Sequence, residues 1–255
     1  MPAPHHPPLS LPDTGAQPHP ALPLLGLTLL AVEDSRFASE ALRLLCQRSG
    51  ARLRRAETLE AAARHLAVYR PDVVIVDLGL PDGDGVDLIR ALTRDGGSGA
   101  VVLGTSGDPA GRSAAIAAGA AGFLDKPLDS LANFQSAVLR HLPGHPTPQP
   151  AHADADPLHP DTLALQDDLA HAALLLRAAT DTPARRYVAG FLGSVAQSAR
   201  DEGLAQAARH AADAPTGLPR LAALVSARLA TADPAFARRR TPPADLAIPL
   251  PPAPG

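Results

Sequence analysis

Several polar residues that could do chemistry each come at the end of a short apolar run. Glu33 and Asp34 follow one such run, Asp77 ends a second, and Thr105 and Lys126 follow two more. Asp77 is the clearest case, because four β-branched residues precede it and a loop of Gly, Pro and Asp follows. A carboxylate held beside other carboxylates, an ammonium group and a hydroxyl could accept a phosphoryl group.

The basic residues of the chain set Lys126 apart. It is the only lysine among the 23 basic residues, and the other 22 are arginines. Lysine and arginine are not equivalent where a compact ammonium group must reach a small anion. The composition therefore favours a specific role for Lys126, because every other basic residue of this chain is an arginine.

The elements that must position these residues alternate between strands and helices from residue 24 to residue 143. We expect strands at 27–32, 51–56, 72–77, 100–103 and 122–124, and helices at 36–49, 57–69, 86–93, 110–118 and 130–142. Such alternation predicts an α/β fold with a doubly wound, five-stranded parallel sheet. The carboxyl ends of parallel strands meet at one edge, so the polar residues should share one pocket.

Three carboxylates in one pocket repel one another, and a divalent cation would relieve that repulsion. Glu33, Asp34 and Asp77 offer only oxygen ligands. Oxygen ligands with open positions for water suit Mg²⁺ better than Zn²⁺, and Mg²⁺ also binds phosphate oxygens. The residues alone therefore predict a Mg²⁺-dependent phosphoryl acceptor.

Four segments, in this order, carry a family resemblance. Residues 24–143 resemble a response-regulator receiver domain of two-component signalling, which has a flavodoxin-like fold. The spacing also fits, with 43 residues from Asp34 to Asp77 and 49 from Asp77 to Lys126. The matching segments are Val32-Glu33-Asp34-Ser35, Asp77-Leu78-Gly79-Leu80-Pro81-Asp82-Gly83-Asp84-Gly85, Ala118-Gly119-Ala120 and Phe123-Leu124-Asp125-Lys126-Pro127.

The resemblance implies a role for each residue of the pocket. Asp77 would accept a phosphoryl group from the phosphohistidine of a sensor histidine kinase or phosphotransfer protein, or from a small phosphodonor. Mg²⁺ would be held by the side chains of Asp34 and Asp77, by the carbonyl of Gly79, and by Glu33 through water. Lys126 would pair with the phosphoryl group, and the peptide bond that follows it would be cis.

The resemblance also implies a switch, and here the sequence departs from the family pattern. Phe123 stands at the position of the switch aromatic residue, whose ring turns inward on activation. The family's usual spacing from Lys126 places the switch hydroxyl at Gly104 rather than at Thr105. Either Thr105 serves or the hydroxyl is missing. We favour Thr105, and Ser106 is the poorer candidate.

Proline-rich stretches divide the rest of the chain. We expect a disordered leader at 1–23, the receiver domain at 24–143, a linker at 144–160, an all-α helical module at 161–233, and a disordered tail at 234–255. The helical module has four apolar-periodic segments, and Thr216 is a candidate cap for the last one. Such a module suits output, docking or dimerisation.

The helical module has no recognition helix with clustered arginines, so we expect no nucleic-acid binding. Phe191-Leu192-Gly193-Ser194 loosely resembles the segment that follows the reactive histidine of histidine phosphotransfer modules. That histidine is missing, and Val188 and Ala189 stand nearby instead. If the kinship is real, the module is degenerate and binds a partner without carrying phosphate. Generic dimerisation or partner docking is the broader alternative.

Charge and cysteine content bound the setting of the protein. A net charge of -3 argues against a chain that coats nucleic acid. The single Cys46 excludes an internal disulfide and fits a reducing compartment. The apolar run at 21–32 is too short to span a bilayer and has no basic residue before it. We expect a cytoplasmic bacterial protein without a membrane segment.

Two other functions compete with a phosphorylation-driven switch that is not itself an enzyme. A phosphatase of the haloacid-dehalogenase type also uses an Asp after a buried strand, but it needs a second Asp two positions on, where this chain has Gly79. A pseudo-receiver that never takes phosphate is disfavoured, because Glu33, Asp34, Asp77 and Lys126 are all present.

Overall fold

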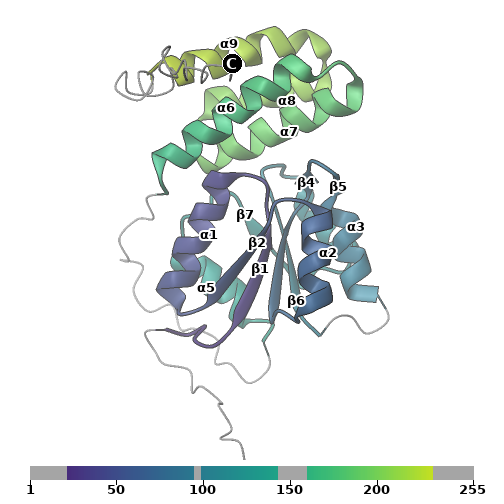
Figure 1. The fold of residues 1–255 in the computed structure, drawn as a ribbon, viewed down its shortest axis with the longest axis vertical. Coiled ribbons are helices and arrows are strands. Elements are labelled where there is room, and N and C mark those ends of the chain that lie inside the picture. The colour runs from purple at the N-terminus through teal and green to yellow at the C-terminus, as the bar shows by residue number, and fades with distance from the viewer. Residues whose placement is uncertain (1–21, 95–98, 143–159, 232–255) are drawn as a thin grey trace, which may run out of the picture.

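The computed structural model describes residues 22–94, 99–142 and 160–231 (Figure 1). The leader, linker and tail that we predict fall outside these residues, apart from a few boundary positions. The described part consists of an α/β domain followed by four helices.

A parallel sheet of five strands forms the centre of the α/β domain, as predicted. Its order is β2-β1-β3-β6-β7, so the chain winds outward in both directions from β1 and β3. All five residues of β3 are buried, which agrees with its run of β-branched side chains. The strands are β1 (Thr28–Val32), β2 (Arg52–Ala56), β3 (Val73–Asp77), β6 (Val101–Ser106) and β7 (Gly122–Asp125).

Strand β6 is longer than the sequence indicated, and this corrects one prediction. Thr105 pairs with Asp77 of β3, and Ser106 pairs with Asp125 of β7. Both residues therefore lie on the strand rather than in the loop after it. The apolar run stops at Leu103, but pairing with two neighbouring strands carries the extended backbone three residues further.

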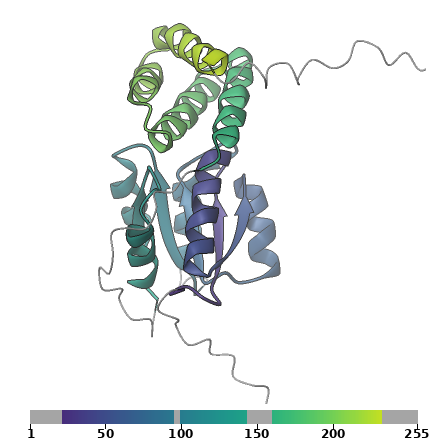
Figure 2. The same cartoon turned by 90° about the vertical axis from the view of Figure 1, so that its left-hand side faces the viewer.

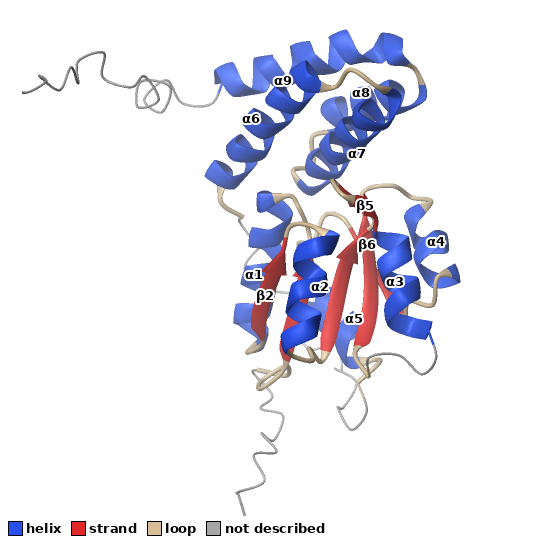
Figure 3. Ribbon diagram, turned by 45° about the vertical axis from the view of Figure 1, so that its right-hand side comes forward, coloured by secondary structure: helices blue, strands red, loops and turns tan. Residues whose placement is uncertain are grey.

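Helices cover both faces of the sheet (Figure 3). One apolar cluster joins α1 and α5 to the sheet through Leu42, Leu45 and Phe134, and a second cluster packs Ala62, Ile89 and other residues of the opposite helices on the other face. The helices are α1 (Arg36–Ser49) and α5 (Leu131–Leu139) on the first face, and α2 (Leu59–Val68), α3 (Gly85–Thr93) and α4 (Gly111–Ala117) on the second.

The Gly/Asp segment after β3 is more ordered than the plain loop that we expected. It forms a two-stranded antiparallel ribbon of β4 (Gly79–Leu80) and β5 (Gly83–Asp84). Asp84 then caps α3 by accepting a hydrogen bond from the backbone of Val86 at 2.8 Å. The ribbon stands at the carboxyl edge of the sheet, beside Asp77.

The C-terminal helices form a small bundle, which we call the helical bundle. Aspartates cap three of its helices, with Asp161, Asp181 and Asp201 each accepting a backbone N–H. A short 3-10 turn at Pro215–Gly217 leads into the last helix, so Thr216 lies in that turn. The helices are α6 (Thr162–Ala178), α7 (Thr182–Ser198), α8 (Glu202–Asp213) and α9 (Leu218–Thr231).

The helical bundle lies across the carboxyl edge of the sheet (Figures 1 and 2). Helix α6 contacts α1, and α7 contacts both α1 and the β4 strand of the ribbon. The bundle has its own apolar core, which includes Phe191, Leu192 and Leu221. It therefore covers the edge at which the polar residues gather without merging its core with that of the α/β domain.

Candidate functional site

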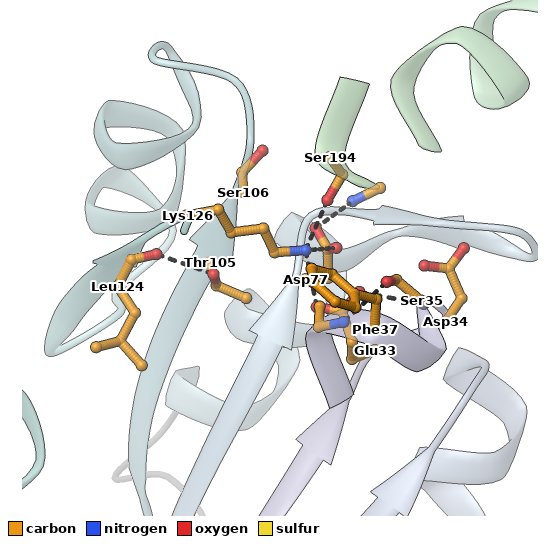
Figure 4. A network of polar contacts seen from close by, with 12 residues as sticks. Glu33, Asp34, Ser35, Phe37, Asp77, Thr105, Ser106, Leu124, Lys126 and Ser194 are labelled. Carbon is orange, nitrogen blue, oxygen red and sulfur yellow. Dashed lines mark hydrogen bonds and ion pairs between the residues drawn. The ribbon is translucent and has the colours of Figure 1, made fainter. Parts of the chain in front are cut away.

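Three carboxylates meet at the carboxyl edge of the sheet, as the sequence predicted. Glu33 and Asp34 follow β1, and Asp77 is the last residue of β3. Each of the three offers an oxygen that lies within 4.8 Å of the others. Glu33 and Asp77 are buried and Asp34 is half-buried (Figure 4).

The backbone around Asp77 holds its carboxylate in place. The amide of Gly79 donates to Asp77 Oδ1 at 3.2 Å. Helix α3 begins directly against the end of β3, because a Cβ at Gly85 would lie only 2.0 Å from the carbonyl oxygen of Asp77. On β1, the amide of Ser35 donates to Glu33 Oε1 at 3.2 Å. Tight turns after both strands therefore aim two carboxylates at one point.

Lys126 brings the positive charge to this point. Its Nζ lies 2.8 Å from Glu33 Oε2 and 2.6 Å from Asp77 Oδ2, and all three side chains are buried. Burial lowers the pKa of Lys126, but the charges of Asp77 and Glu33 outweigh burial and raise that pKa above its ordinary value. The Lys126–Pro127 peptide bond is cis. The two carboxylates thus favour the charged form of the lone lysine.

Burial and the neighbouring Asp77 carboxylate shift the pKa values of the other two carboxyl groups. Burial, followed by the charge of Asp77, raises the pKa of Glu33 well above its ordinary value. The same two causes raise the pKa of Asp34 to about 7. One ammonium group therefore does not balance three carboxylates. An oxygen-only donor set with this imbalance fits Mg²⁺.

The structure places Thr105 opposite Asp77 in the sheet, with its hydroxyl already engaged. Thr105 is fully buried, and its Oγ1 donates to the carbonyl of Leu124 at 2.9 Å (Figure 4). Ser106 lies next to it, and its Oγ accepts from the amide of Asp108 at 3.0 Å. The switch role of Thr105 stays a prediction, and it would require this internal hydrogen bond to break.

Phe123, the predicted switch aromatic residue, packs against Gly104, the position at which the family's usual spacing would place the switch hydroxyl. They pair across β6 and β7, and a Cβ at Gly104 would lie 2.6 Å from the Ala115 Cβ and 3.1 Å from the Phe123 ring. Phe123 is buried, with the Arg112 guanidinium 5.1 Å from its ring centroid. The ring therefore rests where a side chain at position 104 would stand.

A cavity of about 1010 Å³ opens between this edge and the helical bundle. Asp77, Gly79 and Ser106 line its lower side, and Tyr187 and Ser194 of α7 line its upper side. The cavity gives Asp77 a route to a ligand, although Asp77 itself is only 2% exposed.

The α/β domain matches a known family. Residues 29–138 match the sequence profile described as "Response regulator receiver domain". The match spans every strand of the parallel sheet and all the polar residues of its carboxyl edge. These residues form a receiver domain. Their five-stranded fold and the helices that follow agree with the fold class predicted from the sequence.

Named relatives share the receiver domain but not the whole chain. The KDP operon transcriptional regulatory protein KdpE of Escherichia coli is 36% identical over 116 residues, 44% of this chain and 52% of the relative. The transcriptional regulatory protein KdpE of Mycobacterium tuberculosis is 33% identical over 125 residues, 48% of this chain and 55% of the relative. The chain therefore spans about half the length of these relatives.

Among solved structures, the chain is similar to the signal receiver domain of a histidine kinase from Syntrophus aciditrophicus. The two are 26% identical with a TM-score of 0.42, and the match covers 51% of this chain and 99% of that one.

The helical bundle adds two hydroxyl groups to the receiver site, and sequence reasoning did not assign either of them. Lys126 Nζ donates to Ser194 Oγ at 2.6 Å, and the Tyr187 hydroxyl donates to Asp34 Oδ2 at 2.7 Å (Figure 4 shows the first contact). Burial, then the charge of Asp34, raises the pKa of Tyr187 above its ordinary value, so Tyr187 keeps its proton. The only sequence signal was the loose phosphotransfer-like segment that ends at Ser194.

The bundle also caps the first helix of the receiver domain. Asp168 of α6 is 2% exposed and accepts from Ser35 Oγ at 2.7 Å, from the Arg36 amide at 2.9 Å and from the Phe37 amide at 3.0 Å. These amides belong to the first turn of α1, where backbone N–H groups have no partner within the helix. A carboxylate at this end also interacts favourably with the helix dipole.

Two exposed ion pairs complete the contact between receiver and bundle. Arg36 pairs with Asp167 at 2.9 Å, and Arg200 at the end of α7 pairs with Asp129.

In the described residues, no helix is both long and apolar enough to cross a membrane.

Proposed function

We propose that this chain is a response regulator of a two-component phosphorelay that accepts a phosphoryl group on Asp77 with Mg²⁺. The observation that carries the proposal is the convergence of Glu33, Asp34 and Asp77 with Lys126 at the carboxyl edge of a receiver domain. Its expected partner is a sensor histidine kinase or a phosphotransfer protein, and its expected location is the cytoplasm.

The proposed transfer uses the residues of this chain as follows. A carboxylate oxygen of Asp77 attacks the phosphorus atom and forms a new O–P bond. The bond from phosphorus to the donor atom breaks, and its electron pair leaves with the imidazole nitrogen of a phosphohistidine or with the oxygen of acetate when acetyl phosphate is the donor. Lys126, 2.6 Å from Asp77, stabilises the negative charge that gathers on the phosphoryl oxygens.

The carboxylates of Glu33, Asp34 and Asp77, with the Gly79 carbonyl, are the proposed holders of Mg²⁺. When bound, Mg²⁺ supplies positive charge beside the phosphoryl oxygens. The raised pKa values of Glu33 and Asp34 support this assignment, because burial and the charge of Asp77 leave both carboxyl groups in need of a cation.

Intact mass spectrometry tests the acceptor. We expect the parent protein to gain the mass of one phosphoryl group after incubation with acetyl phosphate and MgCl₂, and we expect Asp77→Asn to gain none. Asp84→Asn is the matched control, because Asp84 lines the same cavity and asparagine also caps helices well. A parent protein that gains no mass would overturn the proposal, and steady turnover of phosphate esters would favour a phosphatase.

The finer part of the proposal concerns output. We propose that the helical bundle acts through protein contacts, including contacts with a second copy, rather than through nucleic acid. Its support is the set of side chains that the bundle directs at the receiver domain. The KdpE relatives are named transcriptional regulators, so DNA binding is the alternative. Fluorescence anisotropy with random duplex DNA at low salt should show no binding, and salt-dependent binding would contradict this part.

A further inference from the structure

Ser194 shares the Lys126 ammonium group with the carboxylates of the site. Lys126 Nζ donates to Asp77 Oδ2 at 2.6 Å and lies 2.8 Å from Glu33 Oε2 as an ion pair. It also donates to Ser194 Oγ at 2.6 Å, which takes up one of its three donors. A phosphoryl group on Asp77 would need a donor from Lys126, so Ser194 stands where a phosphoryl oxygen would accept.

Tyr187 engages the other side of the site. Its hydroxyl donates to Asp34 Oδ2 at 2.7 Å, and Asp34 is a proposed metal ligand. A lone pair that accepts a hydrogen bond is less available to a cation. The two hydroxyls of α7 therefore satisfy the groups that a phosphoryl oxygen and a metal ion would otherwise engage.

Helix α7 also packs closely against the loop that follows β6. A Cβ at Gly107 would lie 2.9 Å from the Ser194 Cα and 3.3 Å from the Gln197 Cγ. The Gly107 backbone and α7 are therefore in direct contact. A rotation of the Ser194 side chain away from Lys126 would leave α7 in place and would leave one donor of the Lys126 ammonium group without a partner. A group inserted between Lys126 and Ser194 would have to displace the helix.

We propose that the docked helical bundle is an intramolecular competitor for the receiver site, so that docking and phosphorylation of Asp77 oppose each other. The inference rests on the proposed function and adds its regulation. Linkage makes the effect reciprocal. The factor by which docking weakens the binding of a phosphoryl group equals the factor by which a bound phosphoryl group weakens docking. The undocked bundle exposes Ser194 and Tyr187 and withdraws Asp168 from the first turn of α1.

A kinetic experiment tests one direction of this coupling. Asp168→Ala removes three hydrogen bonds to a carboxylate at the interface, and alanine favours the α6 helix. Such bonds are strong enough that we expect acetyl phosphate to phosphorylate the variant about tenfold faster than the parent. Asp167→Ala is the matched control, because its exposed ion pair should change the rate by less than about twofold.

A second pair of variants probes the contact at Lys126. Ser194→Ala frees one ammonium donor and should also speed phosphorylation. Ser198→Ala, one turn later on α7, removes a buried hydroxyl that has no hydrogen-bond partner, so it should leave the rate unchanged. Circular dichroism confirms that each variant keeps its helices. Equal rates for all four variants and the parent would overturn the competition.

Amide exchange tests the reverse direction in the full chain. The Arg36 and Phe37 amides are protected by Asp168 only while the bundle is docked. We expect beryllofluoride with Mg²⁺ to speed their exchange by about tenfold, in line with the hydrogen bonds lost. Binding of beryllofluoride with unchanged protection would overturn the inference and leave the proposed function standing. No binding, together with no phosphoryl mass on Asp77, would overturn both.

Discussion

The receiver domain and the helical bundle differ in how their cores are filled. In the two receiver clusters taken together, seven of 28 buried residues are alanines, and the rest are mostly larger apolar side chains. In the bundle cluster, seven of 15 buried residues are alanines. Among the described residues, no apolar cluster contains members of both parts. The two parts therefore build separate cores.

The contact between the two parts is of a different kind. Its hydrogen bonds and ion pairs are hydroxyl and carboxylate contacts at Lys126, Asp34 and the first turn of α1, together with exposed ion pairs. Polar interfaces of this kind separate more readily than apolar ones, because water can replace their hydrogen bonds. The difference leads us to expect that stability resides within each part and that the proposed regulation acts at the contact between them.

The largest expected effect comes from Lys126→Met, which removes the buried ammonium group of the receiver domain. It leaves the Glu33 and Asp77 carboxylates buried without their partner, which should cost the receiver domain about 3–5 kcal/mol of unfolding free energy. Urea denaturation measures the loss, and MgCl₂ should restore part of it. Arg64→Met removes an exposed pair with Glu60 and should cost less than about 0.5 kcal/mol. Similar losses for both would contradict the role assigned to Lys126.

A cavity in each core tests whether the two parts unfold separately. Leu192→Ala in the bundle and Leu103→Ala in the receiver each truncate a fully buried side chain and should cost about 2–5 kcal/mol. We expect Leu192→Ala to speed amide exchange throughout α6–α9 while β3 and β6 stay protected, and Leu103→Ala to do the reverse. If either variant loosens both parts equally, the cores are not independent.

A smaller effect is expected at the interface itself. Tyr187→Phe removes one hydroxyl from Asp34, a net hydrogen bond of about 0.5–1.5 kcal/mol. The affinity for Mg²⁺, measured by calorimetry, should therefore rise by up to about tenfold. Tyr69→Phe is the control, because the Tyr69 hydroxyl is buried without a hydrogen-bond partner and far from the site in sequence and fold. An unchanged affinity in Tyr187→Phe would show that the hydroxyl does not compete with the cation.

The last expected effect is a pH dependence centred on Asp34. Burial and the charge of Asp77 raise its pKa from 3.8 to about 7, so the folded protein holds a proton that the unfolded chain has lost. The contribution of Asp34 to stability is therefore full below its unfolded pKa and falls as pH rises to about 7. Since Mg²⁺ displaces that proton, affinity for Mg²⁺ should rise by up to about tenfold per pH unit over the same interval. Asp34→Asn should lack this slope, and a slope that persists in the variant would assign it to another group.

The sequence was sufficient for the receiver fold and for the cluster at its edge. Alternating apolar runs mark parallel strands, and parallel strands place their carboxyl ends together, so Glu33, Asp34, Asp77 and Lys126 could be brought together without coordinates. The end of β6 was harder to predict. Thr105 extends the strand because both neighbouring strands continue to pair there, and local hydrophobicity does not report such pairing.

The contribution of the bundle could not be predicted from the sequence. Its four helices follow from periodicity, but helical periodicity does not say which face meets another domain. Asp168 lies 133 residues from Ser35, and Tyr187 lies 153 residues from Asp34. Asp168 and Tyr187 look like ordinary helix residues in the chain, and only their placement in three dimensions shows what they contact.

The capping of α1 by Asp168 has a consequence for binding strength. Because the bundle belongs to the same chain as the receiver domain, it meets the site at an effective concentration of about a millimolar rather than at the concentration of the protein in solution. Contacts that would be too weak to hold two separate molecules can therefore keep the bundle docked. A free donor protein must compete against this local concentration. A phosphoryl group already bonded to Asp77 belongs to the same molecule, so its competition with the bundle does not depend on the protein concentration.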